Sequence, residues 1–295
     1  MSAEPASAPD TDAPGPRLAR SALYVPGDAP EKLEKALDRG ADEVIVDLED
    51  AVAPARKEYA RSTVADWLSS VDRTDVAVTV RVNAGELGLV DVAAIAGAPA
   101  LAGVVLAKAE RAADVLAVDR VLAAAGSAAG VVPLLESAAS ILRAGEIAAA
   151  PRVHRLQVGE ADLRADLGVT LGPDERELLY VRSQVVLVSA AARIAPPIAP
   201  VSTDFRDLDA LRRSSEALAR MGFVGRACIH PAQVAVVNDV FTPSEAALAE
   251  AADVLAALAA AGSGVAVDGR GRMIDEAVAR QARAVLARAP RGDRP

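Results

Sequence analysis

The sequence predicts an α/β fold built as a (β/α)8 barrel, and two patterns support that prediction. Short apolar runs recur along the chain, and a helical pattern follows most of them. Most runs begin roughly twenty to thirty-five residues after the previous one, about the length of one β–α unit. Eight runs of this kind fit a closed barrel. They cover residues 21–27, 43–50, 76–83, 103–109, 131–137, 154–162, 196–203 and 225–231.

Most of these runs are continuously apolar and rich in β-branched residues, as expected of parallel strands covered on both faces. The run at 196–203 differs, because its prolines disfavour a place in the middle of a sheet. An open, doubly wound sheet satisfies the same periodicity, since periodicity does not reveal whether a sheet closes. No G-x-G-x-x-G follows an early run, so dinucleotide binding has no support in the sequence.

The segments between the runs carry the start and stop signals of helices. Residues 30–40 begin with Pro30, have an acidic residue early and end at Gly40. Residues 209–222 have leucines at helical spacing and end at Gly222. Both segments therefore predict helices that pack one apolar face on the sheet.

The character of the chain changes after residue 262. Four glycines fall within ten residues there, and a helical pattern then continues to about Leu286. We therefore expect a flap and a terminal helix over 262–295, after a barrel that covers 17–261. The first sixteen residues contain four prolines and no apolar stretch, so we expect a disordered tail over 1–16.

The composition excludes several classes of function. A net charge of −9 and a pI near 4.9 argue against a protein that binds nucleic acid or an anionic membrane surface. The single cysteine permits no intrachain disulfide and no cysteine-based metal cluster. The N-terminal segment lacks the basic and apolar regions of a signal peptide, and no run is long enough to span a membrane. We expect a soluble, cytoplasmic protein.

Ionisable and amide side chains follow most of the predicted strands. In a (β/α)8 barrel the C-terminal ends of the strands carry the chemistry, so these side chains are the candidate site. Loops are polar in any protein, which leaves a purely structural role open for each residue. The side chains are Asp47, Glu49, Asp50, Arg81, Asn83, Lys108, Glu136, Glu160, Asp162 and His230.

Glu136 and Asp162 form the pair with the clearest chemical meaning. They lie one β–α step apart, so they belong to neighbouring strand ends. Two carboxylates that converge repel each other unless a cation lies between them, and two carboxylates with several waters suit Mg²⁺. Each acid also has an ordinary alternative as a surface carboxylate, and Asp162 could simply begin a helix.

Arg81 follows a β-branched run and precedes Asn83, which directs it toward the same mouth of the barrel. There it suits a carboxylate, a thioester oxygen or an enolate, although a surface ion pair is the ordinary alternative. Glu49 or Asp50 could orient Arg81 or a metal-bound water. We expect His230 to be a packed, hydrogen-bonded residue and not a general base.

Seven short motifs occur in order from about Arg20 to the last helix. They are RSALYVPGD with EKLEKA, VIVDLEDAV, VRVNAG, VVPLLES, VGEADL, MGFVGRACIHPAQV and GRMIDEAV. Together they resemble the citrate lyase β-subunit and malyl-/citramalyl-CoA lyase family, within the HpcH/HpaI aldolase superfamily. The order of the motifs is more specific than any one of them. Three positions depart from the family pattern: Ala107 before Lys108, Val158, and the segment IAPVSTDF.

The resemblance implies a magnesium-dependent barrel, with Mn²⁺ as an alternative ion, that makes or breaks a carbon–carbon bond in an acyl-CoA. It implies a homotrimer or a higher homo-oligomer. Glu136 and Asp162 match the metal ligands, and Glu136 also matches a substrate contact. Arg81 matches the arginine that binds substrate and stabilises the enolate. Tyr24 and Lys32 fall where family members contact substrate.

Asp275, in the MID motif, matches an acid that relatives place over the active site of a neighbouring subunit. There the acid exchanges a proton with the acetyl carbon, which makes Asp275 a catalytic candidate beside Arg81. Asp47, Glu49, Asp50 and Lys108 are then supporting residues, as is Asn83.

The resemblance predicts cleavage of an acyl-CoA thioester of a hydroxy dicarboxylic acid, of the malyl-CoA or citramalyl-CoA type, into a small 2-oxo acid and an acyl-CoA enolate. Thioester hydrolysis could follow. One alternative is a citrate lyase β-type subunit that acts on a carrier-bound citryl group inside a complex. A second is an aldolase of 2-oxo acids that uses no CoA, and a third is a barrel that has lost catalysis.

Overall fold

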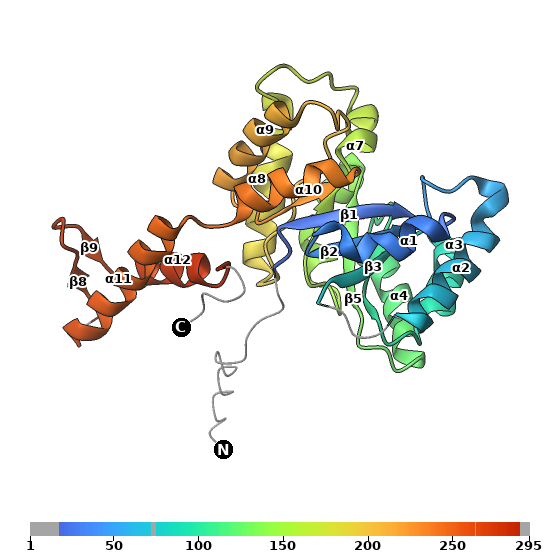
Figure 1. Cartoon of the computed structure of the whole chain (residues 1–295), viewed down its shortest axis with the longest axis horizontal. Coiled ribbons are helices and arrows are strands. Elements are labelled where there is room, and N and C mark those ends of the chain that lie inside the picture. The colour runs from blue at the N-terminus through green and yellow to red at the C-terminus, as the bar shows by residue number, and fades with distance from the viewer. Residues whose placement is uncertain (1–17, 72–74, 263, 290–295) are drawn as a thin grey trace.

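A computed structural model describes residues 18–71, 75–262 and 264–289 of the chain. The expected tail over 1–16 lies outside the described residues. The chain has an α/β fold whose main sheet is parallel, has seven strands and is curled into a half-barrel (Figure 1). The predicted fold class is confirmed at this level.

The strands of the main sheet follow one another in the order β6-β5-β4-β3-β2-β1-β7. Each neighbour is parallel, so all carboxyl ends lie at one edge of the sheet. The strands are β1 (Ser21–Pro26), β2 (Glu43–Asp47), β3 (Ala77–Val82), β4 (Leu101–Leu106), β5 (Gly130–Leu135), β6 (Gln157–Val158) and β7 (Arg226–Cys228).

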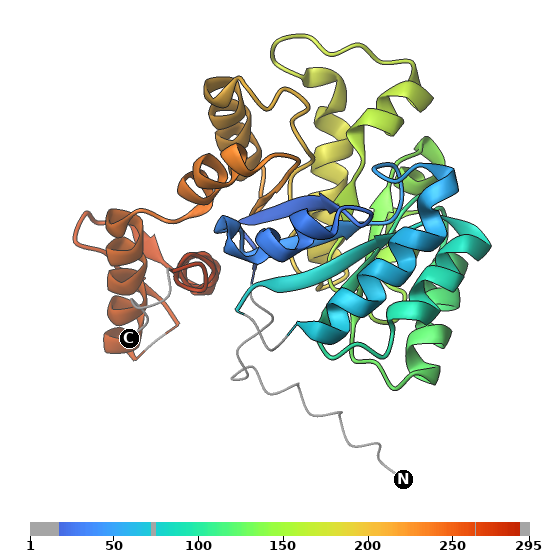
Figure 2. The same ribbon diagram turned by 45° about the vertical axis from the view of Figure 1, so that its right-hand side comes forward.

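Helices connect the strands and lie on the outer face of the curled sheet, as Figures 1 and 2 show. The α-helices are α1 (Pro30–Ala36), α2 (Lys57–Ser70), α3 (Gly85–Ile95), α4 (Ala112–Ala124), α5 (Ala138–Leu142), α6 (Ala144–Ala148), α7 (Glu160–Leu167), α8 (Leu179–Ala191), α9 (Leu208–Arg220) and α10 (Pro231–Phe241). The 3-10 turns are η1 (Leu37–Arg39), η2 (Pro54–Arg56) and η3 (Arg176–Leu178).

The helix signals in the sequence are confirmed at both predicted helices. Pro30 occupies the first position of α1, and Gly40 ends the following turn with a φ of 75°, which favours glycine. Asp207 caps α9 by accepting a 2.8 Å hydrogen bond from the backbone N–H of Ala210. Gly222, with a φ of 105°, follows the end of that helix.

The predicted strand at 196–203 is the segment where the structure departs most from expectation. It forms no regular strand and makes two single parallel bridges, from Ile198 to Gln157 and from Ala199 to Arg226. The physical reason is its prolines, which have no backbone N–H to give to a sheet. The segment nevertheless contacts both edge strands of the sheet, β6 and β7.

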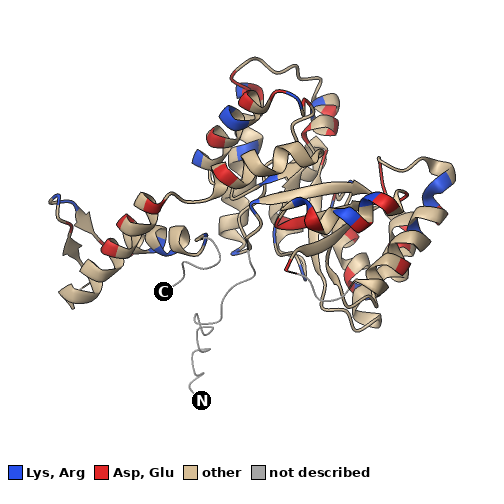
Figure 3. Cartoon of the chain, viewed as in Figure 1, with Lys and Arg blue, Asp and Glu red and all other residues tan. Residues whose placement is uncertain are grey.

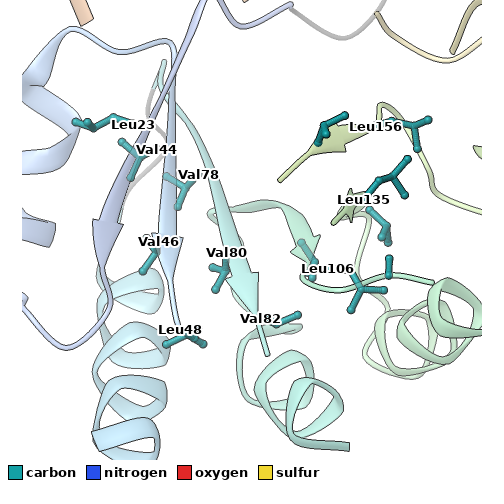
Figure 4. Packing of buried hydrophobic residues seen from close by; sticks show 14 of the residues in the cluster. Leu23, Val44, Val46, Leu48, Val78, Val80, Val82, Leu106, Leu135 and Leu156 are labelled. Atoms are coloured by element: carbon teal, nitrogen blue, oxygen red, sulfur yellow. The ribbon is translucent and has the colours of Figure 1, made fainter. Parts of the chain in front are cut away.

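Two buried clusters divide the core between the two faces of the sheet. The outer cluster joins alternate strand residues such as Val44 and Val46 to the helices, and Figure 4 shows strand residues of this cluster. The inner cluster is smaller and contains Ile45, Val132 and Ala227 from three different strands. Because side chains alternate along a strand, the same strands also place polar residues inside. Because of this alternation, the polar side chains of the candidate site lie on the concave face of the sheet.

The C-terminal part of the chain forms an arm that projects away from the sheet in both Figures 1 and 2. It consists of α11 (Glu245–Ala261), the short antiparallel pair β8 (Ala266–Val267) and β9 (Met273–Ile274), and α12 (Glu276–Leu286). The terminal helix ends at Leu286, as predicted. Helix α11 packs on α12, so the arm begins one helix before residue 262.

Within the described parts of the chain, no helix combines the length and apolar character that crossing a membrane requires.

Candidate active site

A cavity of about 420 Å³ opens at the carboxyl ends of the strands. Its wall combines apolar residues with carboxylates, one arginine, one tyrosine and one glutamine. It is of a size that suits a small-molecule ligand. The polar lining residues are Tyr24, Asp47, Asp50, Arg81, Gln157, Glu136, Glu160 and Asp162.

Arg81 is held in the cavity wall by a fork of two charge-assisted hydrogen bonds. It donates from Nε to Oδ1 of Asp47 at 2.7 Å and from Nη2 to Oδ2 at 2.5 Å. Its Nη1 contacts Glu49 at 3.0 Å and Asp50 at 3.4 Å. β2 and β3 are neighbours in register, Asp47 opposite Arg81, which explains the bidentate geometry. The guanidinium is thus fixed in orientation and still lines the cavity.

Glu49 links Arg81 to Lys108 across two strand ends. Its Oε1 accepts a 2.6 Å bond from the Nζ of Lys108, and burial raises the pKa of Glu49 although both cations oppose that shift. Lys57 was not predicted as a site residue. It donates to the backbone carbonyls of Leu48 at 2.8 Å and Glu49 at 2.6 Å, which secures the loop that carries these acids.

Glu136 lies at the end of β5 and is almost fully buried. Its Oε2 accepts a 3.0 Å bond from the backbone N–H of Lys108, a residue held in the left-handed region with a φ of 51°. Burial raises the pKa of Glu136 to about 7, and the nearby carboxylates of Glu49 and Asp162 add to the rise. A proton or a cation at this position relieves the repulsion.

Gly159 makes room for Glu136, and sequence reasoning missed it. A Cβ at residue 159 would lie 2.5 Å from both Cγ and Oε1 of Glu136, a distance that non-bonded atoms do not tolerate. The signal was present in the sequence, because a lone glycine at a strand end often marks a close approach. Only the structure identifies Glu136 as the group that approaches.

Asp162 is the third residue of α7 and lines the same cavity as Glu136. In residues 18–71, 75–262 and 264–289, no group of three acidic, histidine or cysteine side chains could hold a metal ion by itself. A cation at Glu136 and Asp162 would therefore take most of its ligands from water or substrate. Mg²⁺ prefers this arrangement of few carboxylates and several waters, so the donor set fits it.

Tyr24 and Gln157 line the cavity next to Arg81. The ring of Tyr24 lies 5.2 Å from the guanidinium carbon of Arg81, and its hydroxyl accepts a 3.2 Å bond from Nε2 of Gln157. Burial raises the pKa of Tyr24, so its hydroxyl stays protonated near neutral pH. Gln157 was not predicted. Its Oε1 is buried without a hydrogen-bond partner among the described residues, so it is an acceptor available to a ligand.

Several of the predicted residues do not line the cavity, among them Lys32, Asn83, Glu49 and Lys108. Lys32 is exposed on α1. Asn83 is buried, and its Nδ2 donates to the carbonyl of Leu48 at 3.0 Å and to Asp91 at 2.6 Å. Asn83 therefore ties the loop after β2 to α3, which is a positioning role.

His230 and Asp275 cap helices. His230 accepts a 3.1 Å bond from the N–H of Ala232 and stacks on Phe205 with 4.8 Å between ring centres, so it is hydrogen-bonded as predicted, although the residue is exposed. Asp275 accepts a 3.0 Å bond from the N–H of Val278 at the start of α12. It belongs to the arm and does not line the cavity of its own chain.

The fold and the site define an α/β enzyme with a carboxylate-rich reaction pocket at the ends of parallel strands. The chain belongs to the HpcH/HpaI aldolase/citrate lyase family, whose model matches residues 20–231. One relative, the L-malyl-CoA/beta-methylmalyl-CoA lyase of Rhodobacter capsulatus, is 34% identical over 95% of this chain and 97% of its own. Another, a (3S)-malyl-CoA thioesterase of Cereibacter sphaeroides, is 38% identical over 85% of this chain and 88% of its own.

Solved structures of the same family agree with the fold. CitE from Mycobacterium tuberculosis in complex with magnesium, acetoacetate and coenzyme A has a TM-score of 0.75 and 34% identity, covering 91% of this chain and 97% of CitE. CitE with magnesium and pyruvate has a TM-score of 0.66 and 33% identity, covering 76% of this chain and 91% of CitE.

Proposed function

We propose that this protein is a magnesium-dependent carbon–carbon lyase for an acyl-CoA thioester of a hydroxy dicarboxylic acid, of the malyl-CoA or citramalyl-CoA type. The observation that carries the proposal is the convergence of Glu136, Asp162 and Arg81 on one cavity. The relatives named as malyl-CoA lyases, which match nearly the whole chain, support the substrate class.

Glu136 and Asp162 would hold the cation, either Mg²⁺ or Mn²⁺. When bound, the ion supplies Lewis-acid polarisation of the oxygens of the 2-oxo acid. The two residues contribute the negative charge and the fixed spacing, since Glu136 is anchored by the Lys108 N–H and confined by Gly159. Because its pKa is raised to about 7, Glu136 is partly protonated near neutral pH, so cation binding there would be linked to the loss of that proton.

Arg81 would bind the thioester and stabilise the enolate oxygen that cleavage leaves on the acyl-CoA. Asp47 accepts from two of its nitrogens, so the guanidinium cannot rotate away from the cavity. Tyr24 would pack on the guanidinium and exclude water from that wall. Lys32 would contact the CoA portion of the substrate outside the cavity. The loops after the strands β2, β3 and β4 would be held in place by Glu49, Asp50, Asn83 and Lys108.

Asp275 would act from the partner subunit and exchange a proton with the acetyl carbon. Its place on a projecting arm, outside the cavity of its own chain, supports this assignment (Figure 1). The proposal requires a homo-oligomer in which each arm covers a neighbouring cavity, and a trimer is the expected form. We also infer that the 196–203 segment closes the sheet into a full barrel, because it contacts both β6 and β7. A cytoplasmic location stays a prediction.

The relative named as a thioesterase favours one addition to this chemistry, which is hydrolysis of the thioester after carbon–carbon bond formation. A carrier-bound citryl substrate and a CoA-free aldol cleavage remain the alternatives. These activities differ in their products. Lyase activity releases a 2-oxo acid and leaves the thioester intact, whereas hydrolysis releases free CoA.

The test is a screen of the purified protein with Mg²⁺ against malyl-, citramalyl- and hydroxymethylglutaryl-type CoA thioesters. Both the released oxo acid and free thiol are measured. We expect 2-oxo acid from at least one thioester, and a loss of kcat/KM on the order of 100-fold in Arg81→Lys, since lysine cannot form the fork with Asp47. Absence of any released oxo acid from all three would overturn the proposal.

Arg152→Lys is the matched control for that variant. Arg152 also pairs with an aspartate, Asp119, at 2.5 Å, but it lies at the opposite end of the strands. We expect its kcat/KM to stay close to that of the unaltered protein. Equal losses in the two variants would contradict a specific role for Arg81.

A further inference from the structure

A second cavity of about 570 Å³ lies behind the reaction pocket, between the loop that follows α7, the helix α8 and the helix α9. It shares Glu160, Ala161 and Val201 with the reaction pocket, so the two cavities adjoin at the start of α7. Five arginines and three carboxylates line it, a local excess of positive charge in a chain whose net charge is −9. Nothing in the proposed lyase chemistry uses these arginines.

Arg226 is the most deeply placed of the five and is only 5% exposed. Its Nε donates to the carbonyl of Pro200 at 3.0 Å, and its Nη1 donates to the hydroxyls of Ser214 at 2.7 Å and Ser215 at 2.9 Å. All of these acceptors are neutral. Among the ion pairs of the described residues none includes Arg226, and burial lowers its pKa. The charges of Glu175 and Glu160 offset part of the cost of burying this guanidinium, and an anion in the cavity would offset more of it.

Arg164 and Arg213 line the same cavity, and neither forms an ion pair with any described residue. The Nε of Arg164 is buried and has no hydrogen-bond partner in the described parts of the chain. The other two arginines are already paired. Arg182 pairs with Glu160 at 2.7 Å and with Glu175 at 2.8 Å, and Arg176 pairs with Asp174 at 2.6 Å. Three guanidinium groups around one hollow therefore have no ion pair among the described residues, and the lining as a whole carries two more arginines than carboxylates.

Elsewhere the charges of the molecule are mixed. Figure 3 shows acidic and basic positions interspersed along the helices. The excess around Arg226 is thus a local feature of this cavity. Guanidinium groups pair with phosphate oxygens through two parallel hydrogen bonds, and a phosphate carries close to two negative charges at neutral pH. A dicarboxylate spreads the same charge over a longer distance.

We propose that this second cavity binds a small phosphate-bearing anion on Arg164, Arg213 and Arg226, at a site separate from the reaction pocket. The occupant lies beside Glu160, two residues before Asp162 on α7, so the site borders the proposed cation site. The proposal does not depend on the lyase activity.

The test is calorimetric titration of the purified, full-length protein with inorganic phosphate and with pyrophosphate, at constant ionic strength and without Mg²⁺ or CoA. We expect saturable binding of at least one of the two anions to the unaltered protein, and a loss of at least tenfold in affinity in the double variant Arg164→Gln/Arg213→Gln. Arg220→Gln, on the same helix α9 but outside the cavity, should keep the affinity.

Two further measurements separate this site from the reaction pocket. Glu136→Gln should retain the phosphate affinity of the unaltered protein, and saturating CoA should not displace the anion. Binding that is non-saturable or equal in all variants, or displacement by CoA, would overturn the proposal. Arg226 supports the packing of α9, so the double variant avoids it, and an unchanged melting temperature verifies that this variant is folded.

Discussion

At the scale of single residues, the site depends on a few close approaches between groups far apart in the sequence. Glu136 meets the backbone of Lys108 and the Cα of Gly159, and Arg81 meets Asp47. None of these pairs is adjacent along the chain. The sequence predicted Glu136, Asp162 and Arg81 as site residues because each follows an apolar run. It could not show that Gly159 confines Glu136 or that Gln157 faces Tyr24, since those are tertiary contacts.

Gly159→Ala should weaken Mg²⁺ binding. The added methyl would lie 2.5 Å from Glu136, so either the carboxylate or the backbone of β6 must move. We expect at least a tenfold loss of Mg²⁺ affinity by calorimetry, the size of effect seen when ligand positioning is disturbed. Gly145→Ala is the matched control, because a Cβ there meets nothing within 4 Å. Equal Mg²⁺ affinity in both variants would contradict the assignment.

The lowered pKa of His154 should make the folding stability depend on pH. It lies at the amino ends of the strands, with its Nδ1 buried and unpartnered among the described residues. Burial lowers the pKa of His154 to about 4, and Arg155 adds to the shift. Between pH 6.5 and 4 the unfolded chain binds a proton at this residue that the folded chain does not. The unfolding free energy should therefore fall as pH drops through this range, by up to about 3 kcal/mol.

Urea unfolding at pH 7.0 and pH 5.0 measures this dependence. In His154→Leu the difference in unfolding free energy between the two pH values should shrink. His230→Asn is the control, because His230 caps α10 and asparagine is also a good cap. If His154→Leu kept the full pH dependence, the titration would belong to other groups.

At the scale of elements, the sequence patterns predicted most of the secondary structure. They failed at the run that contains prolines. The apolar runs at 43–50 and 131–137 became β2 and β5, and the glycine stop at Gly40 was confirmed. The run at 196–203 did not form a regular strand, because prolines remove N–H donors. Its two bridges are nevertheless placed where a strand between β6 and β7 would be.

Gly225→Ala should destabilise the junction of β1 and β7. A Cβ at residue 225 would lie 2.1 Å from the carbonyl oxygen of Ala19 and 2.6 Å from that of Arg20. Arg20 accepts the hydrogen bond that begins the β1–β7 pairing, so the clash displaces that pairing. We expect a loss of about 1–3 kcal/mol in unfolding free energy, typical of overpacking. Chemical denaturation checks it, with Gly97→Ala as a control that meets nothing within 4 Å.

At the scale of the whole molecule, the carboxyl ends of the strands all lie on one side of the curled sheet. The arm is formed by the C-terminal part of the chain. The arm packs within itself, α11 on α12, and projects from the sheet (Figure 2). A single chain therefore contains a reaction pocket and, on the arm, Asp275, the acid proposed to complete the pocket of a neighbouring subunit. This separation is the physical reason to expect a shared active site in a homo-oligomer.

Mixed oligomers test that expectation. Glu136→Gln and Asp275→Asn should each be inactive alone, but oligomers containing both should recover activity. In a trimer of randomly mixed subunits, about one quarter of the sites would combine an intact pocket with an intact Asp275 from the neighbour. Lyase assays of co-expressed protein measure this recovery. Oligomers that mix Glu136→Gln with Arg81→Lys should recover none, since both changes lie in one pocket.

If the Glu136→Gln and Asp275→Asn oligomers stayed inactive, Asp275 would have to act in its own chain or not at all. Subunit exchange, followed by mass spectrometry of the intact assembly, verifies that mixing has occurred.

The sequence by itself determined the class of fold, the ends of the helices, and the set of residues that follow the strands. Those features are local, because the spacing of apolar residues and the position of glycine or proline act over a few residues. Only the tertiary structure decided which of those residues share a cavity. The distance between two strand ends depends on strand order and sheet curvature, which no short stretch of sequence contains. For the same reason it was the structure that placed Lys32 and Asn83 outside the cavity. It also brought together, in a second cavity beside it, three arginines that have no ion pair to any described residue.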